Sequence, residues 1–424
     1  MTYDQTVKDE LRPRLLEARL LEALRDSPVV LIHGPRQAGK TTLARHVARL
    51  HTSDYFNFDD DVVRAAAEAD PVRFVADLPA RVVLDEVQRV PTLFTAIKVA
   101  VDRHRIPGRF LLTASANVLL VPKLADSLAG RIEIVRLFPF TQSEIERRTP
   151  DFLPMLFEGA FPAATTGRLG VNLAERIVAG GYPAALARAT ARRRAAWYRD
   201  YIDTMVQRDV RDMARIASLD AMPRLLALAA TQTARLLNVS DLAGPFQLTR
   251  PTIREYVTLL ERVFMLDELP PWHTNRLSRL VKTPKLHVAD TGIAAALLSI
   301  DGPALYEDRD LMGQLLETFL YQELRGQAAG HADEIRFHHF RDKDGYEVDI
   351  VLQAGRRVAG IEVKAASTVR HEDFRGLRRL ATVTGRRFAA GVVLYDGETC
   401  ASFGTGLYAV PIRMLWEGVR SARR

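Results

Sequence analysis

The stretch from Val29 to Leu43 reads VVLIHGPRQAGKTTL and decides the fold of the first part of the chain. It contains the pattern Gly-x-x-x-x-Gly-Lys-Thr between an apolar run typical of a buried strand and a helical pattern. In such a loop the glycines let successive backbone N–H groups point at phosphate oxygens, and the start of the helix adds positive potential. The sequence therefore predicts a phosphate-binding loop formed by Gly34, Pro35, Arg36, Gln37, Ala38, Gly39, Lys40, Thr41 and Thr42.

Two loop residues and a downstream acidic pair supply the expected chemistry. Lys40 is expected to reach the β- and γ-phosphates of ATP, and the Thr41 hydroxyl to hold Mg²⁺. A second apolar strand, RVVLDEVQ, ends in Asp85 and Glu86. Asp85 at a strand tip can bind Mg²⁺ through water, and Glu86 can polarise the attacking water as a general base. The sequence therefore predicts a site that binds ATP with Mg²⁺ and hydrolyses it.

Polar residues follow another buried strand of this region. The strand RFLLTASAN ends near Ser115 and Asn117, which are both candidates to contact the γ-phosphate, and we prefer Asn117. Arg131 comes shortly afterwards. It is either a residue that stabilises transition-state charge, in cis or across the interface of a homo-oligomer, or a structural surface arginine.

Alternating strand and helix patterns around the loop predict an α/β fold, with a parallel sheet and helices on both faces. We divide the chain into three regions: a P-loop domain at 1–145, a helical region at 146–290, and an α/β domain at 291–424. Within the middle region, we expect one long helix from Trp197 to Ile216.

Composition limits the classes of protein that the chain can represent. The 424 residues are 47% hydrophobic and 26% charged, which are values of globular proteins. We find no apolar run long enough for a membrane span, and no apolar signal core near the N-terminus. The single cysteine, Cys400, excludes an internal disulfide and a cysteine-rich zinc site. We therefore expect a cytoplasmic protein.

Basic residues in the middle region point weakly to nucleic acid. The net charge is +7 and the pI is near 9.6. The arginine-rich run from Arg188 to Arg199 is either a nucleic-acid face or a solvated helix face. The segment from Arg235 to Trp272, together with Pro284 to Ala289, has the pattern of a winged helix-turn-helix. Its second helix either enters a DNA groove or packs against protein, and its exposed candidates are Arg250, Thr252, Arg254 and Glu255.

The last region carries a second set of candidate residues. Asp349 and Glu362 lie in successive predicted strands, and Lys364 shares a strand face with Glu362 because side chains alternate along a strand. Glu317 lies in the middle of a preceding predicted helix. Such carboxylates can hold one or two Mg²⁺ ions against a phosphodiester, with Asp349 and Glu362 as ligands, while Lys364 orients the water or neutralises charge. The same fold can also serve only as a scaffold.

The chain resembles a bacterial and archaeal family of AAA-type ATPases with a C-terminal domain of unknown function. That resemblance implies nucleotide and Mg²⁺ binding by Lys40 and Thr41, hydrolysis with Asp85 and Glu86, and a C-terminal part similar to the PD-(D/E)xK nuclease fold. The chain departs from the family at Ala114, where glycine is more frequent. The matching segments are GPRQAGKTTL, VVLDEVQRVP, FLLTASAN, SLAGR, FPFTQSE, GGYPAAL, YIDTMVQRDV, TIREYVTLLE, KTPKLHVADTG, GYEVDIVL and IEVKA.

Three functional hypotheses follow from these patterns. The first is an ATP-hydrolysing, DNA-associated protein whose C-terminal domain is a possible metal-dependent nuclease. The second is an ATP-dependent regulatory switch in which the nuclease-like domain is a non-catalytic binding scaffold. The third is an ATPase that remodels proteins. Nucleotide hydrolysis with and without DNA, together with an assay of strand cleavage, separates them.

Overall fold

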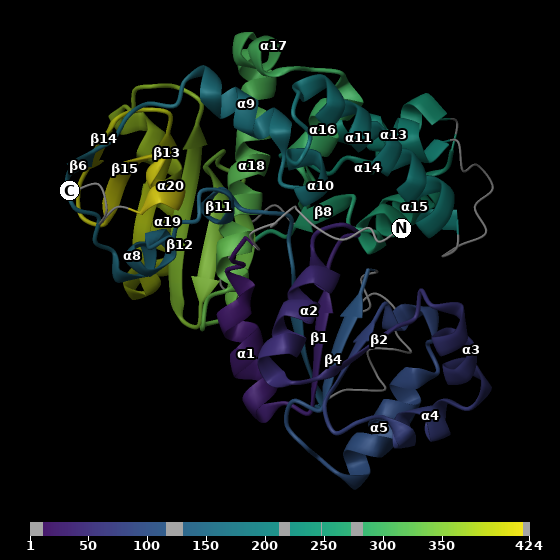
Figure 1. Cartoon of the computed structure of the whole chain (residues 1–424). Coiled ribbons are helices and arrows are strands. Elements are labelled where there is room, and N and C mark those ends of the chain that lie inside the picture. The colour runs from purple at the N-terminus through teal and green to yellow at the C-terminus, as the bar shows by residue number, and fades with distance from the viewer. Residues whose placement is uncertain (1–11, 116–129, 212–220, 247, 273–282, 419–424) are drawn as a thin grey trace.

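A computed structural model describes residues 12–115, 130–211, 221–246, 248–272 and 283–418. Three sheets organise these residues, of five, three and seven strands. Figure 1 shows the five-stranded sheet at the bottom, the seven-stranded sheet at the upper left, and a group of helices at the upper right. A long helix, α18 (Arg309–Ala329), runs between the two upper parts and reaches down towards the lower one.

The first sheet is parallel, with strand order β2-β3-β4-β1-β5. Its strand β1, between β4 and β5, is buried along its whole length, as its run of Val, Leu and Ile predicts. Helices cover both faces of this sheet, so the predicted P-loop α/β fold is confirmed. The elements are α1 (Leu16–Asp26), β1 (Val29–His33), α2 (Lys40–His51), β2 (Asp54–Asn57), α3 (Asp61–Ala69), α4 (Pro71–Asp77), β3 (Val82–Asp85), α5 (Leu93–Arg103), β4 (Phe110–Ala114), β5 (Ile132–Arg136) and α7 (Gln142–Ile145).

The middle region is mostly helical and contains a small antiparallel sheet, β7-β9-β8. Within the segments of the predicted winged pattern, β8 pairs with β9. The predicted helix from Trp197 to Ile216 is only partly found: α11 ends at Thr204, a π-helix covers Met205–Val210, and residues 212–220 lie outside the described residues. The elements are α9 (Val171–Ala179), α10 (Pro183–Leu186), α11 (Ala191–Thr204), α13 (Ala221–Thr231), β7 (Arg235–Leu236), α14 (Val239–Ala243), α15 (Arg250–Arg262), β8 (Leu266–Leu269) and β9 (Lys285–Val288). Two helices follow at the start of the last region, α16 (Thr291–Leu298) and α17 (Gly302–Glu307).

The seven-stranded sheet of the last region has the order β10-β11-β12-β13-β15-β14-β6. Its edge strand β6 (Ala164–Thr165) pairs with β14, and α8 (Phe152–Glu158) packs on β13. Both elements come from the segment that we assigned to the middle region, because pairing across such a distance leaves no local pattern. The other elements are β10 (Ile335–Arg341), β11 (Glu347–Ala354), β12 (Arg357–Lys364), α19 (Arg375–Thr384), β13 (Phe388–Tyr395), β14 (Thr399–Ser402), β15 (Leu407–Pro411) and α20 (Met414–Glu417).

Buried polar contacts join α18 to the P-loop domain. Glu323 of α18 accepts hydrogen bonds from the backbone N–H of Gln142 at 2.5 Å and from the Ser143 hydroxyl at 3.0 Å. These groups belong to the start of α7, whose N–H groups have no partner within the helix. Glu323 is only 3% exposed, and burial raises its pKa to about 7 despite the hydrogen bonds that it accepts from Gln327, Gln142 and Ser143.

We predict that Glu323→Gln flattens the pH dependence of stability. The folded protein holds a proton on Glu323 more tightly than the unfolded chain, so this group stabilises the fold below pH 4.5, and that contribution is lost as pH rises to 7. Between pH 5 and 7.5 the wild type should therefore lose about 2 kcal/mol more unfolding free energy than the variant. Urea unfolding of both proteins at the two pH values measures this difference, and equal losses would contradict the assignment.

Candidate functional site

The loop between β1 and α2 has the backbone geometry of a phosphate-binding loop. A Cβ added at Gly34 would lie 2.2 Å from the carbonyl oxygen of Leu137, so only glycine fits there. Gly39 precedes the first residue of α2 with φ 101°, a left-handed conformation that favours glycine. Both glycines of the motif are therefore required by the structure. The loop and the start of α2 fit the triphosphate of a nucleotide, because backbone N–H groups and a helix N-terminus meet there.

The Lys40 side chain lies against the backbone of this loop. Its Nζ donates hydrogen bonds to the carbonyl oxygens of Gly34 at 3.0 Å and Pro35 at 2.8 Å. The residue is only 4% exposed, so its ammonium group is held at the loop instead of extending into solvent. A phosphate group placed in the loop would give this cation a stronger partner than the two neutral carbonyls.

Thr41 and Asp85 meet at the side of the loop, as predicted for a Mg²⁺ site. The Thr41 hydroxyl donates to Asp85 Oδ2 at 2.9 Å. Asp85 is 1% exposed and also accepts hydrogen bonds from the hydroxyls of Tyr55, at 2.5 Å, and Thr113. Oxygen donors of this kind suit a small hard cation. The residues therefore fit Mg²⁺ when nucleotide phosphates supply its remaining ligands.

Glu86 follows Asp85 in a strained conformation that aims its side chain. Its φ is 59°, which is rare for a residue other than glycine and typical of functional sites. Its backbone N–H donates to the Thr113 hydroxyl at 3.0 Å, and its Oε1 accepts from the Ser115 hydroxyl at 2.7 Å. Of the two candidates at the end of β4, Ser115 thus contacts Glu86, whereas Asn117 lies outside the described residues.

A cavity of about 570 Å³ lies over the loop and has room for a nucleotide. Its floor includes the P-loop, with Arg36, Thr41 and Thr42, and its roof comes from α10 and α11 of the middle region. The Tyr201 hydroxyl donates to the Arg36 carbonyl at 3.2 Å, so the roof contacts the loop directly. Trp197 stacks on Tyr201 with ring centroids 5.0 Å apart. This aromatic roof is a feature that we did not predict from the sequence.

Arg131 lies away from the chain's own loop. It directly precedes β5, which runs parallel to β1, so it belongs to the end of the sheet opposite to the loop. Its guanidinium group pairs with Asp102 of α5, with Nε 2.6 Å from Oδ1. A role in cis is therefore wrong, because the length of β5 separates Arg131 from the phosphate site. A role across a subunit interface stays a prediction.

Arg14 contacts the loop and helps to hold it in place, a role that no pattern in the sequence indicated. Its Nη1 donates to the Ala38 carbonyl at 2.8 Å, and its Nε pairs with Glu144 at 3.0 Å.

His33 directly precedes the loop. Burial first, and the charges of Arg136 and Lys40 next, lower its pKa to about 3. His33 is therefore neutral, and it does not line the cavity, whereas Glu86 does.

The C-terminal acidic residues gather around a lysine from β9. Lys285 Nζ lies 2.9 Å from Glu317 Oε1 on α18, 3.1 Å from Asp349 Oδ1 on β11, and 3.2 Å from Glu347 Oε1. Asp349 Oδ2 accepts from the backbone N–H of Val363 at 2.9 Å, which links the two strands. We call Glu317, Glu347, Asp349 and Glu362 the carboxylate cluster. Glu317 and Asp349 converge as predicted, but their partner is an ammonium group.

Of the two predicted site residues on β12, Glu362 lies at the carboxylate cluster and Lys364 does not. Glu362 follows Ile361 of β12, which pairs with Ile350 of β11, so Glu362 lies beside Asp349 at the cluster. Lys364 instead pairs with Asp373 in the segment before α19. Lys364 therefore does not take the predicted position beside a metal, because Asp373 offers it a carboxylate closer in the chain. Within the described ranges, no group of three or more His, Cys, Asp or Glu is arranged to hold a metal ion.

Lys285 and Glu347 are the site residues that the sequence analysis missed. A lysine in the short apolar segment Lys285–Val288 is the signal that was available, since a lysine buried on a strand requires acidic partners. The partners come from segments far along the chain, so their identity follows only from the fold.

Three family models match parts of the chain. Residues 26–146 match a family model described as an AAA domain. Residues 171–304 and 312–415 match two domains of unknown function, DUF8612 and DUF4143. The uncharacterized protein Rv2008c of Mycobacterium tuberculosis is 30% identical over 395 residues, which cover 93% of this chain and 82% of that protein. The uncharacterized protein Mb2031c of Mycobacterium bovis gives the same values.

Solved structures share less with this chain. The Walker-type ATPase PABY2304 of Pyrococcus abyssi is 15% identical with a TM-score of 0.43, covering 69% of this chain and 98% of that one. The RuvB Holliday junction branch migration motor of Thermotoga maritima is 18% identical with a TM-score of 0.24, covering 60% and 89%. Likenesses at this level carry no argument about function. Among the described residues, no helix is long and apolar enough to cross a membrane.

We predict that Lys40→Ala weakens ATP binding by about tenfold to a hundredfold, because it removes a charge-assisted contact to the phosphates. Titration with a fluorescent ATP analogue measures the affinity. Lys98→Ala on α5 is the control, since it removes a lysine of the same domain that does not line the cavity. Equal affinities for Lys40→Ala and the wild type would contradict the role of the loop.

Proposed function

The chain belongs to the family of the mycobacterial proteins Rv2008c and Mb2031c and carries an ATP-binding AAA domain, and from this premise we propose that it hydrolyses ATP with Mg²⁺. One observation carries the proposal: Lys40, the Thr41–Asp85 pair and the oriented Glu86 surround a single cavity over the P-loop. We place the protein in the cytoplasm as part of this proposal.

Each residue of the site has its own role in hydrolysis. The backbone N–H groups of the loop and the start of α2 bind the phosphates, and Lys40 moves from the carbonyl oxygens to the β- and γ-phosphates. Thr41 and Asp85 would supply oxygen ligands to Mg²⁺, which would neutralise phosphate charge. Glu86 accepts a hydrogen bond from the attacking water and orients it. Ser115 keeps Glu86 in place through its hydroxyl.

We predict that Glu86→Gln lowers the ATP hydrolysis rate by about a hundredfold or more and leaves ATP affinity near the wild-type value, because the amide occupies the same space but is not a base. Phosphate release measures the rate, and the same fluorescent analogue measures binding. Glu68→Gln on α3 removes an exposed carboxylate of the same domain and should change neither. Hydrolysis at the wild-type rate in Glu86→Gln would overturn this role.

DNA association is the second part of the proposal, and the surface of α15 supports it. Arg250, Arg254 and Glu255 are exposed near the N-terminus of this helix, where Thr249 caps it. Arg254 pairs with Glu268 of β8 across the surface. The small sheet β7-β9-β8 lies beside α15, so the order of helices and strands suits a module that places a helix in the major groove. A purely protein-packing role of this module remains the alternative.

We predict that Arg250→Ala weakens binding to duplex DNA and reduces the slope of log affinity against log salt by about one. Fluorescence anisotropy at several salt concentrations measures both quantities. Arg73→Ala on α4 removes an arginine of 74% side-chain exposure far along the chain and is the matched control. If DNA does not bind, or neither variant changes the slope, the protein-remodelling hypothesis takes precedence. Stimulation of hydrolysis by a protein but not by DNA would then be expected.

For the C-terminal domain, with Lys285 in contact with its carboxylates, we propose the role of a binding scaffold. The observation in favour is the contact of Lys285 with Glu317 and Asp349, the residues expected to bind Mg²⁺. A metal-dependent nuclease is the second candidate, supported by the convergence of Glu317, Asp349 and Glu362. For that activity Asp349 and Glu362 would be the Mg²⁺ ligands, and Lys364 would have to leave Asp373 to act beside them.

A further inference from the structure

The carboxylate cluster binds a cation that belongs to the chain itself. Lys285 is the first residue of β9, and three carboxylates lie within 3.2 Å of its Nζ. They come from α18 and β11, so elements of the C-terminal domain surround a residue of the middle region. An ammonium group has three N–H donors, and it finds an acidic acceptor for each.

The acidic partners enclose Lys285. Its side chain is 3% exposed, against 12% for Glu317 and 14% for Asp349. Removing such a charge from its partners is costly because the carboxylates would stay buried without a counter-ion. The contact is therefore a fixed part of the site.

One oxygen of the carboxylate cluster, on Glu362, has no hydrogen-bond partner among the described residues. This oxygen is Oε2, and it is buried. Buried polar groups are normally paired, and this oxygen is an exception. The unpaired oxygen indicates a position for one more ligand contact.

A hard divalent cation takes carboxylate ligands, although with Lys285 in place no group of three or more His, Cys, Asp or Glu in the described ranges is arranged to hold one. We propose that Lys285 is the built-in occupant of a divalent-cation site in the C-terminal domain, and that its ammonium group keeps Mg²⁺ or Mn²⁺ out of the carboxylate cluster. Because β8 and β9 hold Lys285 in place, the middle region keeps the site closed. The inference is independent of ATP hydrolysis at the P-loop.

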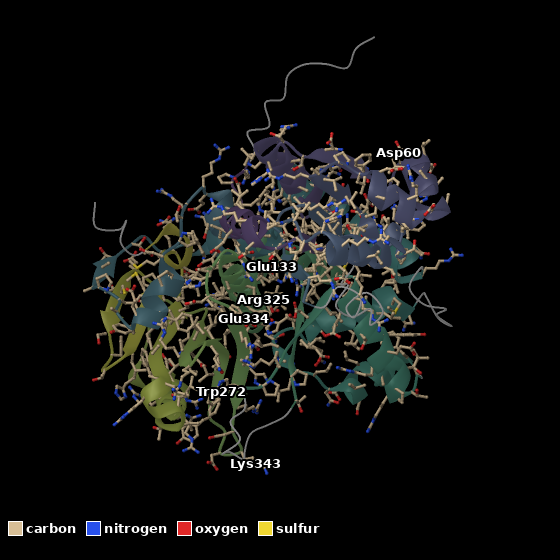
Figure 2. All side chains as sticks on the ribbon, turned by 90° about the horizontal axis from the view of Figure 1, so that it is seen from below. Asp60, Glu133, Trp272, Arg325, Glu334 and Lys343 are labelled. Atoms are coloured by element: carbon tan, nitrogen blue, oxygen red, sulfur yellow. The ribbon has the colours of Figure 1, made fainter. Side chains whose placement is uncertain are left out.

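The test measures Mn²⁺ binding to the nucleotide-free, full-length protein by electron paramagnetic resonance. We expect the wild type to show no Mn²⁺ binding that depends on Asp349. Lys285→Met, which keeps the length of the side chain without its charge, should bind one Mn²⁺ at least about tenfold more tightly than the wild type. Adding Asp349→Asn to this variant should abolish the gain. Lys343→Met, an exposed lysine at the edge of the molecule in Figure 2, should behave as the wild type.

Two outcomes would overturn the proposal. One is Mn²⁺ binding by the wild type that is as tight as in Lys285→Met and is lost in Asp349→Asn. The other is a folded Lys285→Met variant, with the circular dichroism of the wild type, that binds no Mn²⁺. If the variant folds poorly in EDTA, its melting temperature should recover in Mn²⁺ but not in NaCl of equal ionic strength, and failure to recover counts against the proposal. Loss of ATPase activity alone changes none of these results.

Discussion

A buried carboxylate, Asp267 of β8, holds the three regions of the molecule together. Arg136 at the end of β5 pairs with its Oδ2 at 3.2 Å, and Arg325 of α18 donates to the same oxygen. Burial alone would raise the pKa of Asp267, but Arg325 and Arg136 hold it below its ordinary value. In Figure 2 Arg325 lies near the middle of the molecule, whereas Asp60 and Lys343 lie at opposite edges. Removing Asp267 would leave Arg136 and Arg325 without this shared counter-ion, which is strongly unfavourable.

The same small sheet connects the two candidate sites. In the pairing of β8 with β9, Asp267 lies opposite His287, and Leu269 opposite Lys285. On the other side, Arg136 lies opposite His33, the residue directly before the P-loop. The contacts from the nucleotide cavity to the carboxylate cluster are thus continuous. Any displacement of β5 relative to β8 has to break or carry the Asp267 ion pairs, so a nucleotide-dependent movement of the P-loop domain would act on the strand pair that holds Lys285. These contacts connect the two candidate sites. Energetic coupling between the sites would also require this sheet to have two stable arrangements.

The sequence predicted the parts of the molecule that depend on local pattern. Gly34, Lys40, Thr41, Asp85 and Glu86 could be identified because a phosphate site is built from residues close together in the chain or at adjacent strand ends. The α/β fold followed from the same apolar runs. By contrast, Arg14, Tyr201 and Lys285 act through contacts with residues far along the chain. No periodicity reports such pairings, and for the same reason the pairing of β6 with β14 was not predicted.

The charge of the carboxylate cluster explains how one lysine can serve where a divalent ion is expected. Lys285 contacts three carboxylates of the cluster, and Arg341 adds a second cation, since its Nη1 lies 3.6 Å from Glu347 Oε2. Burial first, and the charge of Asp349 next, raise the pKa values of both Glu317 and Glu362. A divalent ion entering the cluster would have to displace Lys285 from Glu317, Asp349 and Glu347, so the lysine and the ion would exclude each other.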